Sequence, residues 1–321
     1  MPSEFNLIQQ YFTRHSPQAD LGIGDDAALV RVSEGSQLAI STDMSVADTH
    51  FFADSAAYDI GWKSLAVNIS DMAAMGALAK WATLAIALPE VSEPWLTEFS
   101  RGFFACTDAF NVDLIGGDTT RGPLNINVTI MGEVPTGKAL QRDGAQIGDD
   151  IWVSGTLGDA ALALAILQQR YKIDLNWPED ELAKWLPNLH RPQPRAALGL
   201  ALRDIATSCI DISDGLLADL GHILKASNCG AEIFLEQLPV SLYNLNHLHE
   251  PTIQQCALAG GDDYELCFTA PTNRRDTIKK ISEKQNLLLT CIGNTRMDNV
   301  LQTMYQNKPL TLLKQGFDHF G

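Results

Sequence analysis

This chain of 321 residues has no long hydrophobic run and few basic residues, and each shortage excludes a class of protein. No apolar stretch approaches the roughly 18 residues of a membrane-spanning helix, so we expect no transmembrane segment. Lysine and arginine number 23 against 39 aspartates and glutamates, and the net charge of -16 argues against nucleic acid or a membrane surface as a partner. The N-terminal region lacks the apolar core of a secretory signal, which predicts a cytoplasmic protein.

Cysteine is also scarce. The six cysteines lie in or beside apolar segments and show no CxxC spacing, so we interpret them as reduced core residues rather than zinc ligands or disulfides. The GxSxG, HExxH and protein-kinase signatures are missing. Residues 132–138 match most of a Walker A loop, but Ala139 stands where the magnesium-binding serine or threonine belongs, so we reject that interpretation.

The composition is that of a folded globular protein, with 45% hydrophobic residues and enough length for two domains. Segments with strand and helix patterns alternate along the chain, which predicts the α/β or α+β class. The polar, glycine-rich stretch 137–150 separates two such regions. We therefore expect domains at residues 1–138 and 139–321.

The periodicity of apolar residues predicts the main elements. In the first half we expect helices over 56–75 and 92–110, and strands over 27–32, 38–41, 81–88, 112–115 and 125–130. In the second half we expect helices over 160–167, 216–224 and 276–285, and strands over 151–154, 264–269 and 287–292.

Aspartates flanked by glycine, serine or threonine recur beside these apolar segments. The most prominent motif, Gly116-Gly117-Asp118, directly follows the expected strand 112–115 and suggests a turn at which a ligand can approach. The same pattern occurs at Gly24-Asp25-Asp26, Ser41-Thr42-Asp43, Ile69-Ser70-Asp71, Asp211-Ile212-Ser213-Asp214 and Gly260-Gly261-Asp262-Asp263. The repeated Ile-Ser-Asp string raises the question of an internal structural repeat, which the sequence leaves open.

Such carboxylates would need cations if they met in one cleft. Like charges ~4 Å apart repel by roughly 4 kcal/mol at an effective dielectric of 20. Oxygen ligands without histidine or cysteine favour Mg²⁺, which proteins commonly hold together with substrate phosphates. The sequence therefore predicts a nucleotide polyphosphate bridged by several Mg²⁺ ions, with Asp26, Asp43, Asp71, Asp118, Asp211 and Asp214 as ligands. The alternative is that each aspartate only caps a helix or holds a turn.

The motifs, together with Gly316-Phe317-Asp318, closely resemble those of the bacterial thiamine-monophosphate kinases, in order and along nearly the whole chain. The resemblance implies the two-domain fold shared with aminoimidazole ribonucleotide synthetase. In that fold the N-terminal domains pair in a homodimer and a C-terminal α/β domain closes over the nucleotide.

The resemblance also implies roles for individual residues. It adds Ser41 and Thr42 to the magnesium ligands. It places Phe110, Gly117, Asp118, Arg142 and Ser213 at the nucleotide, with Asp118 and Arg142 acting in catalysis. It places His50, Asp262 and Phe317 at the thiamine phosphate. The family often has glutamate in place of Asp262 and tryptophan or tyrosine in place of Phe317, and Phe317 has C-terminal packing as an alternative role.

The implied reaction is ATP-dependent phosphorylation of thiamine monophosphate to thiamine diphosphate. At pH 7 the acceptor phosphate is already largely anionic, so we expect direct in-line transfer with no general base. The rival interpretations are another ATP-using member of the superfamily, such as aminoimidazole ribonucleotide synthetase or selenophosphate synthetase, a metal-dependent phosphohydrolase, and a nucleotide-binding module without activity. The first cysteine, Cys106, is too late in the chain for the N-terminal cysteine of selenophosphate synthetase.

Overall fold

The computed structural model describes residues 4–168, 179–312 and 316–317. The chain divides into two compact units: the first comprises Met1–Met72 and Ala77–Ala139, and the second comprises Ala73–Gly76 and Leu140–Gly321. Both units combine helices with a β-sheet, which confirms the predicted fold class. The division into domains 1–138 and 139–321 stays a prediction, because compactness does not show that either part folds by itself.

The first unit is built on a four-stranded sheet of order β1-β4-β2-β3. The edge strand β1 (Ser36–Val46) pairs antiparallel with β4 (Asn125–Pro135), and β4 pairs antiparallel with β2 (Leu78–Leu88). β3 (Asp113–Arg121) runs parallel to β2, and the helix α3 (Glu93–Phe110) makes the crossover between them.

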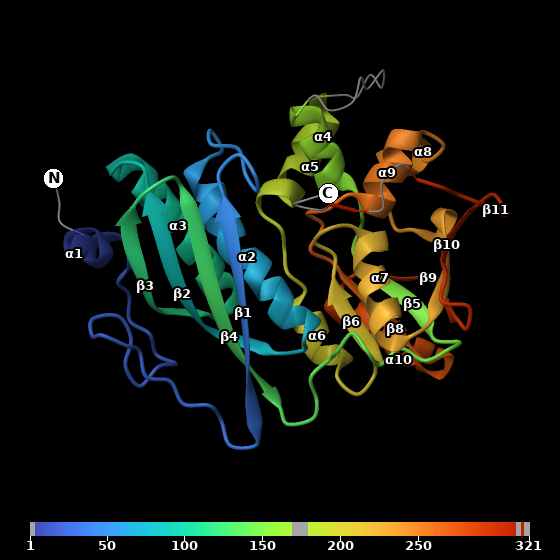
Figure 1. The fold of residues 1–321 in the computed structure, drawn as a ribbon, viewed down its shortest axis with the longest axis horizontal. Helices are drawn as coiled ribbons and strands as arrows, with labels where there is room; N and C mark the ends of the chain where they lie inside the picture. The colour runs from blue at the N-terminus through green and yellow to red at the C-terminus, as the bar shows by residue number, and fades with distance from the viewer. Residues whose placement is uncertain (1–3, 169–178, 313–315, 318–321) are drawn as a thin grey trace. The chain divides into compact units, whose positions relative to one another are not determined.

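The helices α2 (Ala57–Ala74) and α3 lie on one side of this sheet (Figure 1). Every second residue of β4 is buried, as expected for a strand with one face on the core: Ile126, Val128 and Ile130 are at most 1% exposed. The two helices approach closely because α2 presents Gly61, where a Cβ atom would lie 2.1 Å from the carbonyl oxygen of Phe99.

Three sequence predictions for the first unit need correction. Residues 27–32 form no strand, and only an isolated bridge joins Leu29 to Leu21. The strand expected at 38–41 is longer, so Asp43 lies inside β1. The strand expected at 112–115 continues to Arg121, so Gly116-Gly117-Asp118 lies within β3 and is not a turn after it. The main-chain pairing with β2 continues through the glycines and keeps this segment extended.

The second unit contains a seven-stranded sheet of order β11-β10-β7-β9-β5-β8-β6. All its pairs are antiparallel except β10 with β7. Its strands are β5 (Asp150–Ser154), β6 (Ser208–Asp211), β7 (Gly230–Phe234), β8 (Leu266–Ala270), β9 (Leu289–Arg296), β10 (Leu301–Tyr305) and β11 (Lys308–Pro309). Its α-helices are α4 (Asp159–Leu167), α5 (Glu179–His190), α6 (Ala196–Leu202), α7 (Leu216–Ser227), α8 (Leu242–Asn246), α9 (Pro251–Ala259) and α10 (Arg275–Gln285).

Helices cover both faces of the second sheet because its central strands are apolar on both sides. In β5, Ile151 and Val153 belong to one core with residues of α4, α7 and α9. Trp152, between them, points to the opposite face and packs in a second core with residues of α6 and α10. The unit is therefore a three-layer arrangement of helices, sheet and helices.

The remaining elements are short. The N-terminal region contains α1 (Glu4–Leu7) and the π-helical turn η1 (Ile8–Phe12), and the second unit contains the 3₁₀ turns η2 (Leu235–Gln237) and η3 (Thr272–Arg274). Among residues 4–168, 179–312 and 316–317, no helix is long and apolar enough to span a membrane. All six cysteines are free and five of them are buried, which agrees with their predicted place in the core, whereas Cys291 is only partly buried.

Candidate active site

Three of the predicted magnesium ligands meet where β1 faces α2. The Ser41 hydroxyl donates a 2.5 Å hydrogen bond to Oδ2 of Asp71. Asp43, two residues further along β1, lies on the same face of the sheet. Burial, and then the charge of Asp71, raise the pKa of the Asp43 carboxyl to about 7. The structure therefore holds two carboxylates of like charge beside one hydroxyl at the covered face of the sheet.

The donor atoms of these three side chains suit a hard cation. All three side chains offer oxygen, which Mg²⁺ prefers, and a cation beside Asp43 and Asp71 would offset their repulsion. In the described part of the chain, however, no three histidine, cysteine, aspartate or glutamate side chains gather closely enough to hold a metal ion. Convergence of all six predicted aspartates stays a prediction, because they are divided between the two units.

Strand alternation puts other predicted ligands on the opposite face of the first sheet. Thr42 is exposed there, and its hydroxyl donates to the carbonyl oxygen of Val128 at 3.0 Å. Asp118 pairs in register with Ala85 and is also exposed, whereas the next residue, Thr119, is buried toward the helices. Side chains of Thr42 and Asp118 therefore point away from Ser41 and Asp43.

The backbone around position 117 requires glycine. Its φ is +153°, and a Cβ atom would lie 1.8 Å from the carbonyl oxygen of Leu84 on the adjacent strand β2. No other residue fits there without displacing β2. At Gly116, the nearest atom to a Cβ would be the Thr83 methyl carbon at 3.8 Å, so this second glycine meets no such restriction.

The other residues predicted in the first unit are Asp26, His50 and Phe110. Asp26 is exposed in an irregular segment, where its backbone N–H donates to Oδ1 of Asp25 at 2.9 Å. Nδ1 of His50 accepts from the backbone N–H of Val46 at 3.0 Å, which ties the ring to the end of β1. Phe110, the last residue of α3, makes an edge contact with Trp62.

In the second unit the structure brings five predicted residues together around one loop. The loop of residues 212–215 connects Asp211, the buried last residue of β6, to α7. The backbone N–H of Asp262 donates to the carbonyl oxygen of Ser213 at 2.9 Å. The backbone N–H of Phe317 donates to the carbonyl oxygen of Asp214 at 3.1 Å. Residues predicted at the nucleotide, the metal and the acceptor are thus neighbours through their main chains.

The segment that carries Asp262 adopts an unusual backbone conformation. Asp262 and Tyr264 have φ values of +70° and +50°, in the left-handed region that favours glycine. Both residues are held there by bonds to the loop after β6, since the N–H of Tyr264 donates to the carbonyl oxygen of Ile212 at 2.8 Å. Strain of this kind persists where surrounding contacts determine the conformation.

Arg142 lies beside the edge strand β6, away from the residues 213–215. The preceding residue, Gln141, accepts a 3.0 Å bond from the N–H of Cys209, and the carbonyl oxygen of Arg142 accepts from the Ser227 hydroxyl at 2.9 Å. Its side chain is exposed. The catalytic role predicted for Arg142 and Asp118 stays a prediction, because Asp118 belongs to the other unit.

Two buried acidic residues beside Asp262 were not among the site residues predicted from the sequence. The backbone N–H of Gly158 donates to both carboxylate oxygens of Asp263, at 3.0 and 3.1 Å, and burial raises the pKa of this carboxyl well above its usual range. Glu265, 5% exposed, accepts hydrogen bonds from Nε of Arg195 and from the Ser154 hydroxyl. The signal available in the sequence was adjacency to Asp262.

Asp219 is another buried acidic residue that was not predicted from the sequence. It lies in the first turn of α7 and is 3% exposed. Burial and the charge of Asp214 raise the pKa of its carboxyl to about 7, although three backbone hydrogen bonds oppose that shift. The sequence did contain a signal for this residue. Helix N-termini favour negative charge, and Asp219 is an acidic residue in the first helical turn after the Asp211-Ile212-Ser213-Asp214 motif.

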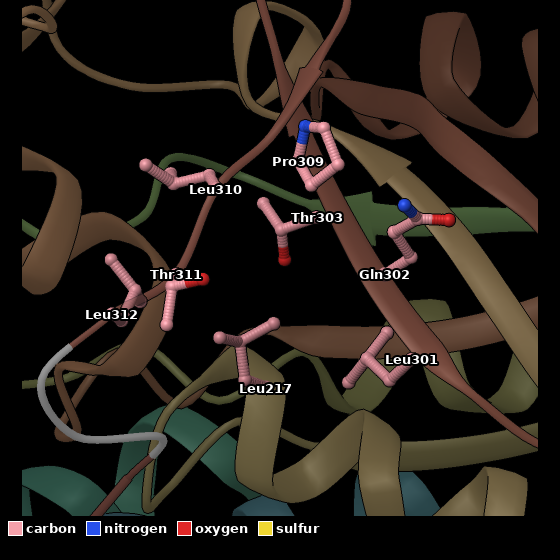
Figure 2. Close-up of a pocket in the computed structure, with 8 residues that line it drawn as sticks. All are labelled: Leu217, Leu301, Gln302, Thr303, Pro309, Leu310, Thr311 and Leu312. Atoms are coloured by element: carbon pink, nitrogen blue, oxygen red, sulfur yellow. The ribbon is translucent and has the colours of Figure 1, made fainter.

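A cavity of about 240 Å³ lies between the start of α7 and the strands β10 and β11 (Figure 2). Its lining residues are Leu217, Leu301, Gln302, Thr303, Pro309, Leu310, Thr311 and Leu312. None of the residues predicted to bind a ligand lines it.

The two units match two family models in the order in which they occur. The N-terminal domain model of AIR synthase related proteins matches residues 24–134, and the corresponding C-terminal domain model matches residues 146–305. These matches define the class as a two-domain AIR synthase related protein.

Full-length relatives narrow the family. The thiamine-monophosphate kinases of Escherichia coli K12 and Salmonella typhimurium are 48% and 47% identical over 323 residues, covering 99% of this chain and 98% of each relative. The chain belongs to the thiamine-monophosphate kinase family and is therefore an enzyme.

Solved structures agree with this assignment. The thiamine-monophosphate kinase of Stenotrophomonas maltophilia superposes with a TM-score of 0.84 at 47% identity, covering 92% of this chain and 93% of that one. The structure of AaThiL complexed with AMPPCP and TMP superposes with a TM-score of 0.77 at 31% identity, covering 93% and 92%. The hydrogenase maturation protein HypE, 20% identical with a TM-score of 0.75, shares the fold.

Proposed function

We propose that this enzyme transfers the γ-phosphoryl group of ATP to thiamine monophosphate and so forms thiamine diphosphate. The observation that carries the proposal is 47–48% identity, over nearly the full chain, to thiamine-monophosphate kinases. The AaThiL complex with AMPPCP and TMP, at 31% identity, supports ATP as the phosphoryl donor.

The residues described above suit a reaction that depends on positioning and charge. The acceptor is a phosphate monoester whose second pKa lies near 6, so its oxygen is already largely anionic at pH 7 and needs no general base. Two anions must then be aligned in line, and correct alignment alone contributes roughly 7 to 11 kcal/mol. We therefore propose direct transfer without a phosphoenzyme.

Mg²⁺ is part of this proposal. The residues that would hold it are the predicted ligands Asp26, Ser41, Thr42, Asp43, Asp71, Asp118, Asp211 and Asp214. When bound, it would neutralise charge on the phosphate oxygens. The like-charged pair Asp43 and Asp71 supports a cation at that point of the first sheet. Gly117, Asp118, Phe110, Arg142 and Ser213 would orient the nucleotide, and His50, Asp262 and Phe317 the acceptor.

A coupled assay tests the activity. Purified protein with ATP and Mg²⁺ should form ADP and thiamine diphosphate only when thiamine monophosphate is added, and unphosphorylated thiamine should not substitute for it. Loss of ATP without an acceptor would contradict the kinase and favour a phosphohydrolase. Labelled phosphate bound covalently to the protein after incubation with [γ-³²P]ATP would contradict direct transfer.

We also propose that two copies of the chain pair through the first sheet. The face of β1 that points away from the helices exposes Leu38, Ile40 and Met44 at 38%, 62% and 54%. An apolar row on an edge strand favours association with another chain. Light scattering should give a dimer of about twice 35.0 kDa, and Ile40→Glu should shift it to the monomer. A wild-type monomer would contradict this pairing.

A further inference from the structure

Asp219 gathers three consecutive backbone N–H groups onto a single carboxylate oxygen. Its Oδ2 accepts hydrogen bonds from the N–H groups of Ser213, Asp214 and Gly215, at 3.0, 3.0 and 3.1 Å. The carboxylate is 3% exposed, so water does not compete for these donors. Successive N–H groups that point to one spot form a concave anion site, and here a side chain of the same protein fills it.

Two other segments, at Asp262 and Phe317, donate hydrogen bonds to the residues that Asp219 holds. Ser213 accepts the N–H of Asp262, and Asp214 accepts the N–H of Phe317. Both segments come this close because they present glycine. A Cβ at Gly261 would lie 2.4 Å from the Ser213 carbonyl oxygen, and one at Gly316 would lie 2.5 Å from the Ala218 Cβ.

We infer that Asp219 is a positioning residue that fixes the 213–215 loop and, through it, the main chain of the acceptor segments at Asp262 and Phe317. The inference rests on the proposed kinase function and extends it to a residue that does not contact either substrate. Because the N–H and carbonyl groups of Ser213 are both occupied, its hydroxyl is the group that would contact the nucleotide. The loop amides cannot cradle a phosphate while Asp219 holds them.

Matched variants separate positioning from general stability. Asp219→Ala removes the acceptor of all three N–H groups, whereas Asp219→Asn keeps a carbonyl oxygen of similar shape. Asp149 is the control, because it is also buried, 4% exposed, and accepts the N–H of Gln146 and the hydroxyl of Thr207. Asp149 also lies far from the 213–215 loop. The next residue, Asp150, pairs with the last residue of β8, whereas Asp211, just before the loop, pairs with the first residue of β8. Asp149 and the loop are therefore at opposite ends of the sheet.

We expect Asp219→Ala to raise KM for both ATP and thiamine monophosphate at least tenfold, and Asp219→Asn to stay within threefold of wild type. Asp149→Ala should lower Tm yet leave both KM values within twofold. Hydrogen exchange of the 213–215 amides should accelerate at least tenfold in Asp219→Ala alone. Unchanged exchange and KM in Asp219→Ala, equal KM effects from Asp149→Ala, or Asp219→Asn as impaired as Asp219→Ala would each overturn the inference.

The exchange experiment also keeps this inference separate from the proposed function. Should the wild-type protein fail to phosphorylate thiamine monophosphate, the kinase proposal falls. Amide exchange of the 213–215 loop and binding of AMPPCP, measured by calorimetry, would still decide the role of Asp219. If Asp219→Ala does not fold, the same two measurements on Asp219→Asn must match wild type within threefold, and a larger change overturns the inference.

Discussion

Ser41 and Asp71 are 30 residues apart in the chain, yet their side chains are joined by a 2.5 Å hydrogen bond between β1 and α2. The bond brings the carboxylate of Asp71 to the face of β1 on which Asp43 also lies. The charge of Asp71 disfavours the ionised form of Asp43, and carboxyl groups perturbed in this way cluster at functional sites.

Removing one of these charges should stabilise the protein and abolish its activity. At pH 8 without Mg²⁺, Asp43→Asn should raise the free energy of unfolding by about 1 to 2 kcal/mol, because the folded state no longer holds two neighbouring carboxylates. Its kinase rate should fall at least 100-fold.

Chemical denaturation and the coupled assay measure the two effects. Asp108→Asn is the control, since Asp108 is 71% exposed in a surface ion pair with Arg14 and should change neither quantity appreciably. A less stable Asp43→Asn protein would show that the carboxylates do not oppose folding.

The two glycines before Asp118 should differ sharply in tolerance. Gly117→Ala places a Cβ where the Leu84 carbonyl oxygen lies, so strands β2 and β3 must separate locally. We expect a loss of about 3 kcal/mol or more in stability, or no soluble protein. Gly116→Ala has room for its methyl group and should cost less than about 1 kcal/mol. Thermal unfolding compares the variants, and equal losses would contradict the register of Gly117 beside Leu84.

Two aromatic substitutions test the separation of the substrates. Phe317→Ala should raise KM for thiamine monophosphate about tenfold and leave KM for ATP within twofold, because aromatic faces attract a cationic heterocycle. Phe110→Ala should instead raise KM for ATP and leave KM for thiamine monophosphate within twofold. Steady-state kinetics with each substrate varied in turn measures both. Equal effects on the two KM values would instead indicate that Phe317 only packs against the protein.

The buried carboxyl of Asp159 should make stability depend on pH. Burial raises its pKa to about 6 from the ordinary 3.8, while a hydrogen bond from Ser241 opposes the shift. The folded protein therefore holds this proton more tightly than the unfolded chain. The stabilisation is complete below pH 4 and is lost as pH rises through 6, by roughly 3 kcal/mol at most.

Asp159→Asn should reduce this pH dependence. Its carbonyl oxygen can still accept from Ser241 and Asn244, which both donate to Oδ1 of Asp159. Urea unfolding between pH 4 and 7 gives the slope for each protein, with Asp180→Asn, at a 73% exposed side chain, as control. Identical slopes for wild type and Asp159→Asn would show that Asp159 titrates alike in both states.

Local pattern predicted most of the elements. The apolar period of α2 and the alternation of β4 follow from one buried face each, so spacing alone located them within a few residues. The ends of the helices and strands were harder to predict from the sequence. Gly116 and Gly117 suggested a turn, but pairing with β2 keeps them extended, and that pairing depends on residues about 30 positions away.

The sequence by itself determined the class of the fold, the acidic and glycine-rich motifs and the family that they resemble, because those depend on residue type and order. Tertiary structure decided what each motif does. The same Ile-Ser-Asp string is helical at Asp71 in α2 and lies in a loop after β6 at Asp214, so it is no repeated structural unit. Only the folded chain brings the Ser41 hydroxyl to Asp71 and the backbone N–H of Ser213 to Asp219. These contacts and their burial arise from the packing of helices and strands, which the order of residues does not reveal.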